Sequence, residues 1–188
     1  MASNVEIKAI VRDVQKFLRV AESLKTSPAE DLTQHDIFFV VPYGRLKLRL
    51  TTGMPAELIH YVREDAAVPR QSQYSIFPID NPELLRTILR NALGVLGEVR
   101  KKRHLFIIHE TRIHLDEVED LGYFGEIEVV LGRNKSVDDG IKIARDLMKE
   151  LGIEENDLIQ NAYIDLLRSR VSSPATTLPL SSSEPRIY

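Results

Sequence analysis

Hydrophobic and polar residues alternate along several short segments of the chain, the pattern expected of strands with one buried face. The clearest case is 45–50, where Arg or Lys alternates strictly with Leu. A strand over these residues would place its cations on one face and its leucines on the other. The patterning predicts strands over 4–11, 35–41, 45–51, 57–65, 70–78, 98–108, 110–117 and 123–131.

Other segments repeat apolar residues at the spacing of a helix. They cover 14–25, a segment that begins at Pro82 and whose exit is flanked by Gly94 and Gly97, about 137–151 and about 155–168. The residues 26–33 are expected to be a loop. Asp13, Asn81 and Ser136 are suitable N-cap residues. Because nearly every connection between strands is short, we predict an α+β fold, an eight-stranded antiparallel β-barrel wrapped by helices.

Composition then narrows the classes of protein. The 188 residues suggest one domain over 1–170 and a Ser- and Pro-rich tail over 171–188, which we expect to be disordered. Such a tail is either inert or a docking or phosphorylation segment. The chain has no cysteine, which excludes disulfides, zinc–thiolate sites and cysteine nucleophiles.

Charge and hydropathy also limit the partners. The net charge of −3 gives no global basic field for nucleic acid, and no apolar run is long enough to span a membrane. The N-terminal residues are too charged for a signal peptide. We therefore expect a cytoplasmic protein, monomeric or homodimeric, with no nucleic-acid or membrane partner.

The polar faces of the predicted strands carry many charges. Their same-face residues are Asn4, Glu6 and Lys8; Arg45, Lys47 and Arg49; Tyr61, Arg63 and Asp65; Lys101 and Arg103; Arg112, His114 and Asp116; Glu126 and Glu128. The positions between them are mostly Val, Ile and Leu. If the apolar faces point outward, the charged faces meet inside the barrel. Buried charges of this number require carboxylates, metal ions or a bound polyanion beside them.

Phosphoanhydride chemistry uses this combination of residues. Arginine and lysine neutralise phosphate oxygens, and carboxylates hold Mg²⁺ or Mn²⁺. Each charged face taken alone is more simply explained as a solvated sheet face, and His114 alone as a hydrogen-bonded sheet residue. Taken together on strands with apolar opposite faces, the charges favour a tunnel that binds a triphosphate.

Other chemistries have no comparable pattern in the chain. There is no Gly-rich phosphate loop, no HExxH or paired-histidine zinc motif, and no nucleophile elbow. Aromatic and basic residues do not interleave as they would on a single-stranded nucleic-acid platform.

The charged strands described above resemble those of the CYTH superfamily, the triphosphate tunnel metalloenzymes, and the resemblance covers roughly residues 4–168. The branch with the greatest similarity is that of the class IV adenylyl cyclases. The matching segments are VEIKA (5–9), Gln34 with Asp36, GRLKLR (44–49), LIHYVRED (58–65), Arg70 with Ser72 and Tyr74, VRKKR (99–103), RIHLDEVEDLG (112–122) and GEIE (125–128). The resemblance implies the same eight-stranded barrel.

The resemblance also implies roles for individual residues. Metal ligands for Mg²⁺ or Mn²⁺ would be Glu6, Asp116, Glu126 and Glu128. The bases that bind the triphosphate would be Lys8, Arg45, Lys47, Arg49, Arg63, Lys101, Arg103 and Arg112, with Lys8 and Arg112 also catalytic. The chain departs from the family at Asn4, where the first Glu of the ExExK motif is replaced by an amide that has no charge and cannot act as a base.

Three functions remain open at this point. The first is a metal-dependent phosphohydrolase acting on inorganic triphosphate, a nucleoside triphosphate or thiamine triphosphate. The second is an adenylyl cyclase that converts ATP to cyclic AMP and pyrophosphate. The third is a non-catalytic binder of polyphosphate or nucleotide, which the loss of a carboxylate at Asn4 supports.

Overall fold

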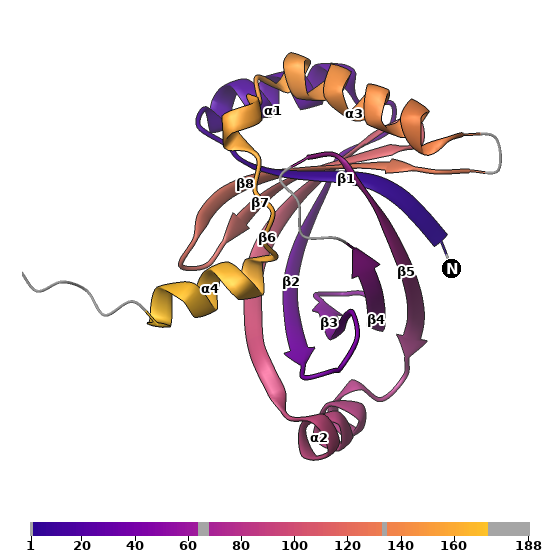
Figure 1. The fold of residues 1–188 in the computed structure, drawn as a ribbon, viewed down its shortest axis with the longest axis vertical. Helices are drawn as coiled ribbons and strands as arrows, with labels where there is room; N and C mark the ends of the chain where they lie inside the picture. The colour runs from indigo at the N-terminus through magenta and orange to yellow at the C-terminus, as the bar shows by residue number, and fades with distance from the viewer. Residues whose placement is uncertain (1, 64–67, 133–134, 173–188) are drawn as a thin grey trace, which may run out of the picture.

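Eight antiparallel strands close into a barrel in the computed structural model, which describes residues 2–63, 68–132 and 135–172 (Figure 1). The strands are β1 (Ala2–Ile10), β2 (Glu30–Phe39), β3 (Arg45–Thr51), β4 (Ala56–Arg63), β5 (Arg70–Ile79), β6 (Val95–Ile108), β7 (Thr111–Val118) and β8 (Gly122–Val130). Around the barrel they follow the order β1-β5-β4-β3-β2-β6-β7-β8, and β1 pairs with β8 to close the ring. The predicted fold class is confirmed.

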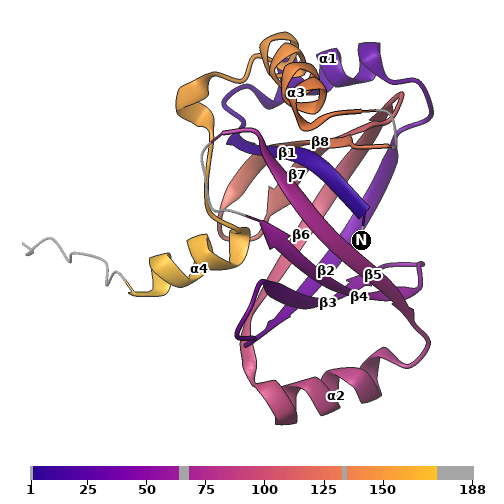
Figure 2. The same ribbon diagram turned by 45° about the vertical axis from the view of Figure 1, so that its right-hand side comes forward.

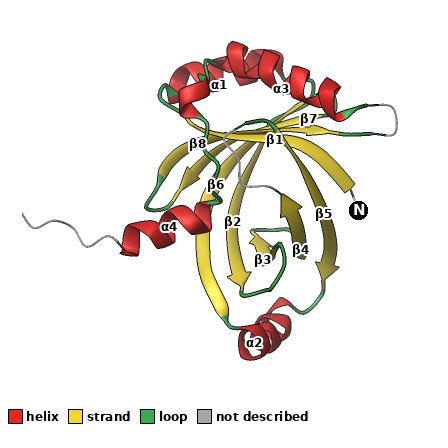
Figure 3. Cartoon of the chain, viewed as in Figure 1, coloured by secondary structure: helices red, strands yellow, loops and turns green. Residues whose placement is uncertain are grey.

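Within the described residues, four helices lie on the outside of the barrel (Figure 3). They are α1 (Val14–Leu24), α2 (Pro82–Leu93), α3 (Val137–Leu151) and α4 (Tyr163–Ser172), and a short 3₁₀ turn, η1 (Glu155–Asp157), precedes the last of them. Figure 2 shows α1 and α3 together on one side of the barrel, α2 on the opposite side and α4 between them. The barrel wall is therefore covered in separate patches.

The alternation in β1 explains how one strand serves two environments. Val5 and Ile7 point outward and are fully buried under α1 and α3, together with Ile127 and Val129 of β8. The intervening residues point into the barrel, because successive side chains of a strand face opposite ways. The outer core of β1, β7 and β8 therefore fixes the direction of the charged side chains inside.

Helix α3 has the local sequence signals of a helix at both ends. The Ser136 hydroxyl accepts a hydrogen bond from the Asp139 backbone N–H at 3.1 Å, and the Asp139 carboxylate accepts one from the Ser136 N–H. Gly152 ends the helix at φ 74°, a left-handed conformation that glycine adopts without strain. Ala144 and Met148 then pack in the hydrophobic core between the helix and the outer face of the barrel.

The leucines of β3 face outward, as predicted. Leu48 is fully buried with Ile37 and Phe39, and Leu46 and Leu50 pack beside them under α2. The basic residues of the same strand consequently face the inside of the barrel. This placement satisfies the central condition of the tunnel prediction.

The two largest errors in the predicted boundaries concern β2 and the last helix, and β6 also begins at Val95, before its predicted start at 98. Strand β2 begins at Glu30, so the predicted loop over 26–33 is strand in its second half. Polar residues there are held by pairing with β6 along the whole length of β2, from Glu30 opposite Leu105 to Phe39 opposite Val95. The strand was missed because this pairing, and not local hydrophobicity, stabilises it.

The last helix was also predicted wrongly. A continuous helix over 155–168 was expected, but Leu158 and Ile159 are extended and lie against β1. The Ile159 N–H donates to the carbonyl oxygen of Lys8 at 2.8 Å, and α4 begins only at Tyr163. Pairing with a barrel strand therefore replaces the middle of the expected helix.

Some predictions concern residues outside the described ranges. Asp65 is one, and 173–188 of the predicted tail is another, while Val171 and Ser172 belong to α4. Among the described residues, no helix is both long and apolar enough to cross a membrane.

Candidate active site

A cavity of about 540 Å³, lined by many charged side chains, occupies the inside of the barrel. All eight strands contribute inward side chains to its wall, and Ala162 and Tyr163 border it from the start of α4. Cavities of this size commonly hold small ligands. The inward positions predicted from the alternation therefore do meet in a single space.

One wall of the cavity carries a carboxylate shared by two bases. Asp36 of β2 accepts hydrogen bonds from Arg49 at 2.7 and 2.8 Å and from Lys47 at 2.8 Å. Its side chain is buried, and both bases come from the adjacent strand β3. Arginine therefore binds this carboxylate in the bidentate manner in which it would bind a phosphate.

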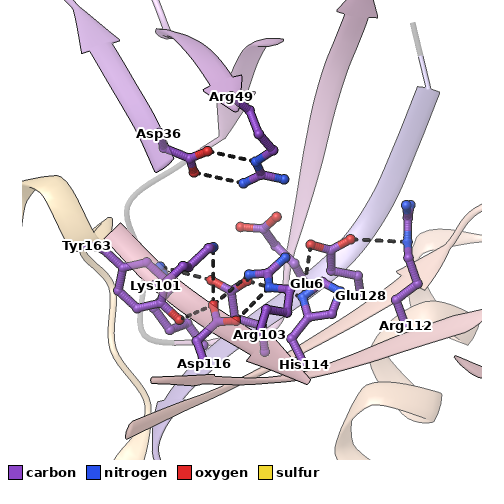
Figure 4. Close-up of polar contacts among 12 residues, drawn as sticks. Glu6, Asp36, Arg49, Lys101, Arg103, Arg112, His114, Asp116, Glu128 and Tyr163 are labelled. Atoms are coloured by element: carbon purple, nitrogen blue, oxygen red, sulfur yellow. Dashed lines mark hydrogen bonds and ion pairs between the residues drawn. The ribbon is translucent and has the colours of Figure 1, made fainter. Parts of the chain in front are cut away.

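A second group lies across the cavity from the first. Figure 4 shows Asp36 and Arg49 on one side and the residues around Asp116 on the other. Asp116 of β7 is fully buried and accepts two hydrogen bonds from Arg103, both 2.6 Å long. Lys101 and the Tyr163 hydroxyl also donate to it, at 3.3 and 3.0 Å. Asp116 thus accepts hydrogen bonds from three different side chains.

Glu126 of β8 connects this group to β1. Its carboxylate lies 3.1 Å from the Lys8 ammonium and 2.7 Å from the Arg103 guanidinium. The same carboxylate lies 3.4 Å from Nδ1 of His114. The register explains these contacts, because Glu126 stands opposite Lys8 on β1 and opposite His114 on β7.

The structure brings three potential metal ligands together. One ligand atom each from His114, Glu126 and Glu128 lies within 4.8 Å of the others. Glu128 also lies 3.3 Å from the Arg112 guanidinium. An imidazole and two carboxylates at this spacing fit one divalent cation, and carboxylates are the ligands that Mg²⁺ and Mn²⁺ prefer.

Glu6 has a different environment. It stands opposite Glu128 in the β1–β8 register but is ion-paired with Arg63, and Arg70 lies 4.0 Å away. It is outside the three-residue group. Asp116 is outside it as well, so the group holds two of the four predicted metal ligands and adds His114.

Burial and charge shift the acid–base properties of the cavity. Burial lowers the pKa of Lys8 to about 8 and, with the nearby Arg49, that of Lys47 to about 7. Burial and Arg103 lower the pKa of His114, which is therefore neutral at pH 7 with a lone pair available to a metal. Burial opposes ionisation of Glu126, but Lys8 and Arg103 outweigh it and hold its pKa well below the usual value.

The bases expected to bind triphosphate divide into two groups. Those that line the main cavity are Lys8, Lys47, Arg49, Arg63, Lys101, Arg103 and Arg112. Arg45 instead borders a neighbouring cavity of about 370 Å³ and pairs with Asp165 of α4 at 2.8 Å. The alternation correctly predicted that Arg45 lies on the inward face of β3. It carries no information about how far the cavity extends along the strand.

Three residues of the site were not predicted as site residues. His114 taken alone was explained as a hydrogen-bonded sheet residue, but it lies with Glu126 and Glu128. Asp36 was noticed only as part of a family motif, because its contact with β3 depends on strand register. Tyr163 had no signal at all, since it was expected in the middle of a helix. Two buried side-chain oxygens in the cavity wall, Oδ1 of Asn4 and Oε1 of Gln34, have no hydrogen-bond partner among the described residues.

Comparison with known proteins agrees with this architecture. The CYTH domain family matches residues 2–163. No curated protein matches the chain in sequence. The PH1012 protein from Pyrococcus horikoshii OT3 is 26% identical with a TM-score of 0.74, and the match covers 87% of this chain and 98% of that one.

Two more distant structures share the fold. A Vibrio parahaemolyticus protein described as a candidate adenylate cyclase is 19% identical, with a TM-score of 0.71 and coverage of 88% of this chain and 97% of that chain. The Hippeastrum protein HpAC1, described as having a dominant triphosphatase activity, is 16% identical, with a TM-score of 0.63 and coverage of 89% and 96%. CYTH proteins bind triphosphates and are typically metal-dependent triphosphatases. With its closed barrel, charged cavity and family match over 2–163, the chain belongs to the CYTH family of triphosphate tunnel proteins.

Proposed function

We propose that this protein is a metal-dependent hydrolase that binds a triphosphate in the barrel and cleaves a terminal phosphoanhydride bond. The observation that carries the proposal is the position of His114, Glu126 and Glu128 in the same cavity as seven basic side chains. A polyanion and a divalent cation can then bind side by side. Neither the bases nor the carboxylates alone would favour this chemistry.

The proposed cation is Mg²⁺ or Mn²⁺, held by Glu126, Glu128 and His114. When bound, it would neutralise charge on phosphoryl oxygens. Glu6 stands opposite Glu128 and could join this set only by leaving Arg63. The donor atoms already lie within 4.8 Å of one another, so no strand has to move to bring them together.

Lys8 and Arg112 are the proposed catalytic residues, and each would act as a cation. Lys8 is paired with Glu126 and Arg112 with Glu128, so the two cations lie beside the two carboxylates of the proposed metal site. A phosphoryl group at that site would be within reach of both. They would stabilise the negative charge that develops on its oxygens as the bond breaks.

Lys47 and Arg49 are proposed to hold another part of the triphosphate. Both face the cavity from β3, and both are paired only with Asp36 in the hydrogen bonds described above. Figure 4 shows Arg49 across from Asp116. Asp116 itself is better assigned as a support. Its oxygens are occupied by Arg103, Lys101 and Tyr163, and it is not part of the cavity wall.

An adenylyl cyclase is the second candidate, and one feature of the cavity favours it. Met54, Pro55, Ile76 and Pro78 give part of the wall an apolar surface, which the triphosphate itself does not require but a nucleobase could use. The fold shared with the Vibrio protein is consistent with this alternative. A non-catalytic binder is the third, because Asn4 leaves the tunnel one carboxylate short of the family motif.

Product analysis distinguishes the three functions. The full chain would be incubated with Mg²⁺ or Mn²⁺ and, separately, with inorganic triphosphate and ATP, and phosphate, pyrophosphate and cyclic AMP would be resolved. Phosphate released from triphosphate, abolished by a chelator, is the expected result. Cyclic AMP with pyrophosphate would replace the hydrolase by the cyclase, and tight binding without turnover would identify a binder.

A further inference from the structure

Tyr163 contacts three charged side chains of the site, which core packing alone does not require. It is the first residue of α4, its side chain is 5% exposed, and it borders the cavity. The Lys8 ammonium lies 3.5 Å from the centre of its ring, and the Lys101 ammonium lies 5.2 Å from it. Its hydroxyl donates to Asp116 at 3.0 Å.

Each of these contacts restrains a different group. An ammonium over the face of an aromatic ring is attracted by the ring quadrupole, more strongly when it is away from water. The ring therefore holds Lys8 from one side, while Glu126 attracts it from the other at 3.1 Å. The hydroxyl fixes Asp116, the carboxylate that aligns Lys101 and Arg103. Burial and Asp116 raise the pKa of Tyr163 well above its usual value, so the hydroxyl remains a donor.

Helix α4 is anchored so that the ring cannot easily move away. Tyr163 packs edge-to-face against Phe124 with ring centres 5.1 Å apart. Ile164, the next residue, is buried against Gly97, where an added Cβ would meet the Ile164 Cδ1 atom at 2.5 Å. Asp165 pairs with Arg45 at 2.8 Å. Three consecutive residues thus attach the start of α4 to three different strands.

We propose that Tyr163 is a positioning residue that holds the Lys8 ammonium in the direction of the bound triphosphate, so that the docking of α4 completes the basic site. The proposal rests on the proposed function, since Lys8 is assigned there to the phosphoryl group. It goes beyond that function by making a residue outside the barrel strands necessary for full triphosphate affinity.

The ring and the hydroxyl can be separated by two substitutions. Tyr163→Phe keeps the ring under Lys8 and removes the bond to Asp116, whereas Tyr163→Leu removes both. We expect the dissociation constant for inorganic triphosphate, measured without metal by isothermal titration calorimetry, to change less than about threefold in Tyr163→Phe and to rise about tenfold in Tyr163→Leu. Equal affinity in Tyr163→Leu and the wild type, or equal losses in both variants, would overturn the proposal.

The same titration separates positioning from packing. If Tyr163 only stabilises the fold, Tyr163→Leu would lower the fraction of molecules that bind, seen as reduced stoichiometry, and leave the dissociation constant unchanged. A higher dissociation constant at full stoichiometry supports positioning. Should the wild type bind triphosphate but not hydrolyse it, the hydrolase assignment fails while this comparison still decides the role of Tyr163.

A ligand-free measurement covers the case in which the wild type does not bind triphosphate, which would contradict the proposed function. Ring currents shift protons above an aromatic face upfield, so the Lys8 ε-CH₂ protons should be shifted in the wild type and in Tyr163→Phe but not in Tyr163→Leu. Unshifted Lys8 protons in the wild type would overturn the Tyr163 proposal.

A variant away from the cavity tests the docking of α4. In Gly97→Ala the added methyl group pushes against Ile164, and we expect triphosphate affinity to fall about threefold although Gly97 does not line the cavity. Gly122→Ala is the matched control, because this glycine also has a positive φ and nothing lies within 4 Å of its added Cβ. Equal affinities in the two glycine variants would count against the docking of α4 as part of the site.

Discussion

Glu128 stands opposite Glu6 across the β1–β8 strand pair, yet the two carboxylates have different arginine partners. Glu128 faces Arg112 and His114, whereas Glu6 is paired with Arg63. A cation bound by Glu128 would therefore release Arg112 to a phosphate. Metal and triphosphate should help each other to bind, because the carboxylates that hold one are the partners of the bases that hold the other.

Glu128→Gln should lower turnover in the presence of metal but raise the affinity for triphosphate in its absence. We expect turnover with Mg²⁺ or Mn²⁺ to fall at least about 100-fold, because a metal ligand is lost. Triphosphate binding in a chelator should become about threefold tighter, because one negative charge beside Arg112 is removed. Steady-state kinetics and calorimetry measure the two quantities.

Glu57→Gln provides the matched control for Glu128→Gln. Glu57 also lines the cavity but lies outside the three-residue group. The assignment of Glu128 fails if both variants lose the same turnover, or if metal-free affinity falls in Glu128→Gln.

His114→Gln should change the preference between metal ions. Imidazole nitrogen is a poorer ligand for Mg²⁺ than for transition-metal ions, so the wild type should be activated at lower Mn²⁺ than Mg²⁺ concentrations. The variant should need about tenfold more Mn²⁺ and only slightly more Mg²⁺. Activation curves and Mn²⁺ binding followed by electron paramagnetic resonance would measure this. If the ratio of the Mn²⁺ and Mg²⁺ concentrations needed for activation is the same in the variant and the wild type, His114 is excluded as a ligand.

Arg49→Ala should weaken both triphosphate binding and the fold. Asp36 is buried and, of its hydrogen-bond partners among the described residues, would keep Lys47 alone, so the free energy of unfolding should fall by about 3 kcal/mol. Arg100→Ala is the control, because Arg100 is 55% exposed and its contact with Glu98 is worth less than about 1 kcal/mol. Urea denaturation measures both. Asp36→Asn combined with Arg49→Ala should recover part of the loss, and a purely additive result would contradict the pairing.

Triphosphate binding should weaken as the pH rises through about 7. Burial and Arg49 lower the pKa of Lys47 to about 7, so the free protein loses this charge above that pH. A bound polyanion favours the charged form, so the complex takes up a proton and affinity falls by up to about tenfold per pH unit above the free pKa. Calorimetry at a series of pH values, in buffers of different ionisation enthalpy, would detect the uptake.

Lys47→Arg isolates this effect, because arginine stays charged throughout the range. The variant should lose the proton uptake near pH 7 and keep a weaker dependence from Lys8, whose pKa burial lowers to about 8. Protonation of the triphosphate itself is the same in both proteins and cancels in the comparison. Identical pH profiles would rule out Lys47 as the titrating group.

The sequence predicted which way residues face better than where segments begin and end. Lys47 and Leu48 were assigned to opposite faces of β3 from alternation alone, because a strand leaves no other arrangement. The start of β2 at Glu30 and the extended Leu158 depend on pairing with distant strands, and single-segment patterns carry no such information. The fold class was therefore predicted correctly while several element boundaries were not.

The contacts within the site were less predictable than its composition. Most of the bases and carboxylates of the site were predicted from the sequence, with Asp36 as an exception, but their partners depend on register. Asp36 meets Arg49 only because β2 and β3 align these two positions, and His114 meets Glu126 for the same reason on β7 and β8. Tyr163 reaches the cavity through an irregular segment, for which the sequence offered no pattern. The assignments of individual metal ligands and bases stay predictions until they are tested.

The contact between Tyr163 and Lys8 joins the second charged position of β1 to a residue 155 positions later in the chain. During synthesis at the ribosome, the N-terminal strand would emerge long before α4, and β8, which closes the ring against β1, would also be late. The nascent chain would thus carry its inward charges without their final partners until most of the protein had been made. Folding of this barrel is consequently governed by its slowest and most distant contacts, and the complete site can form only as one of the last events.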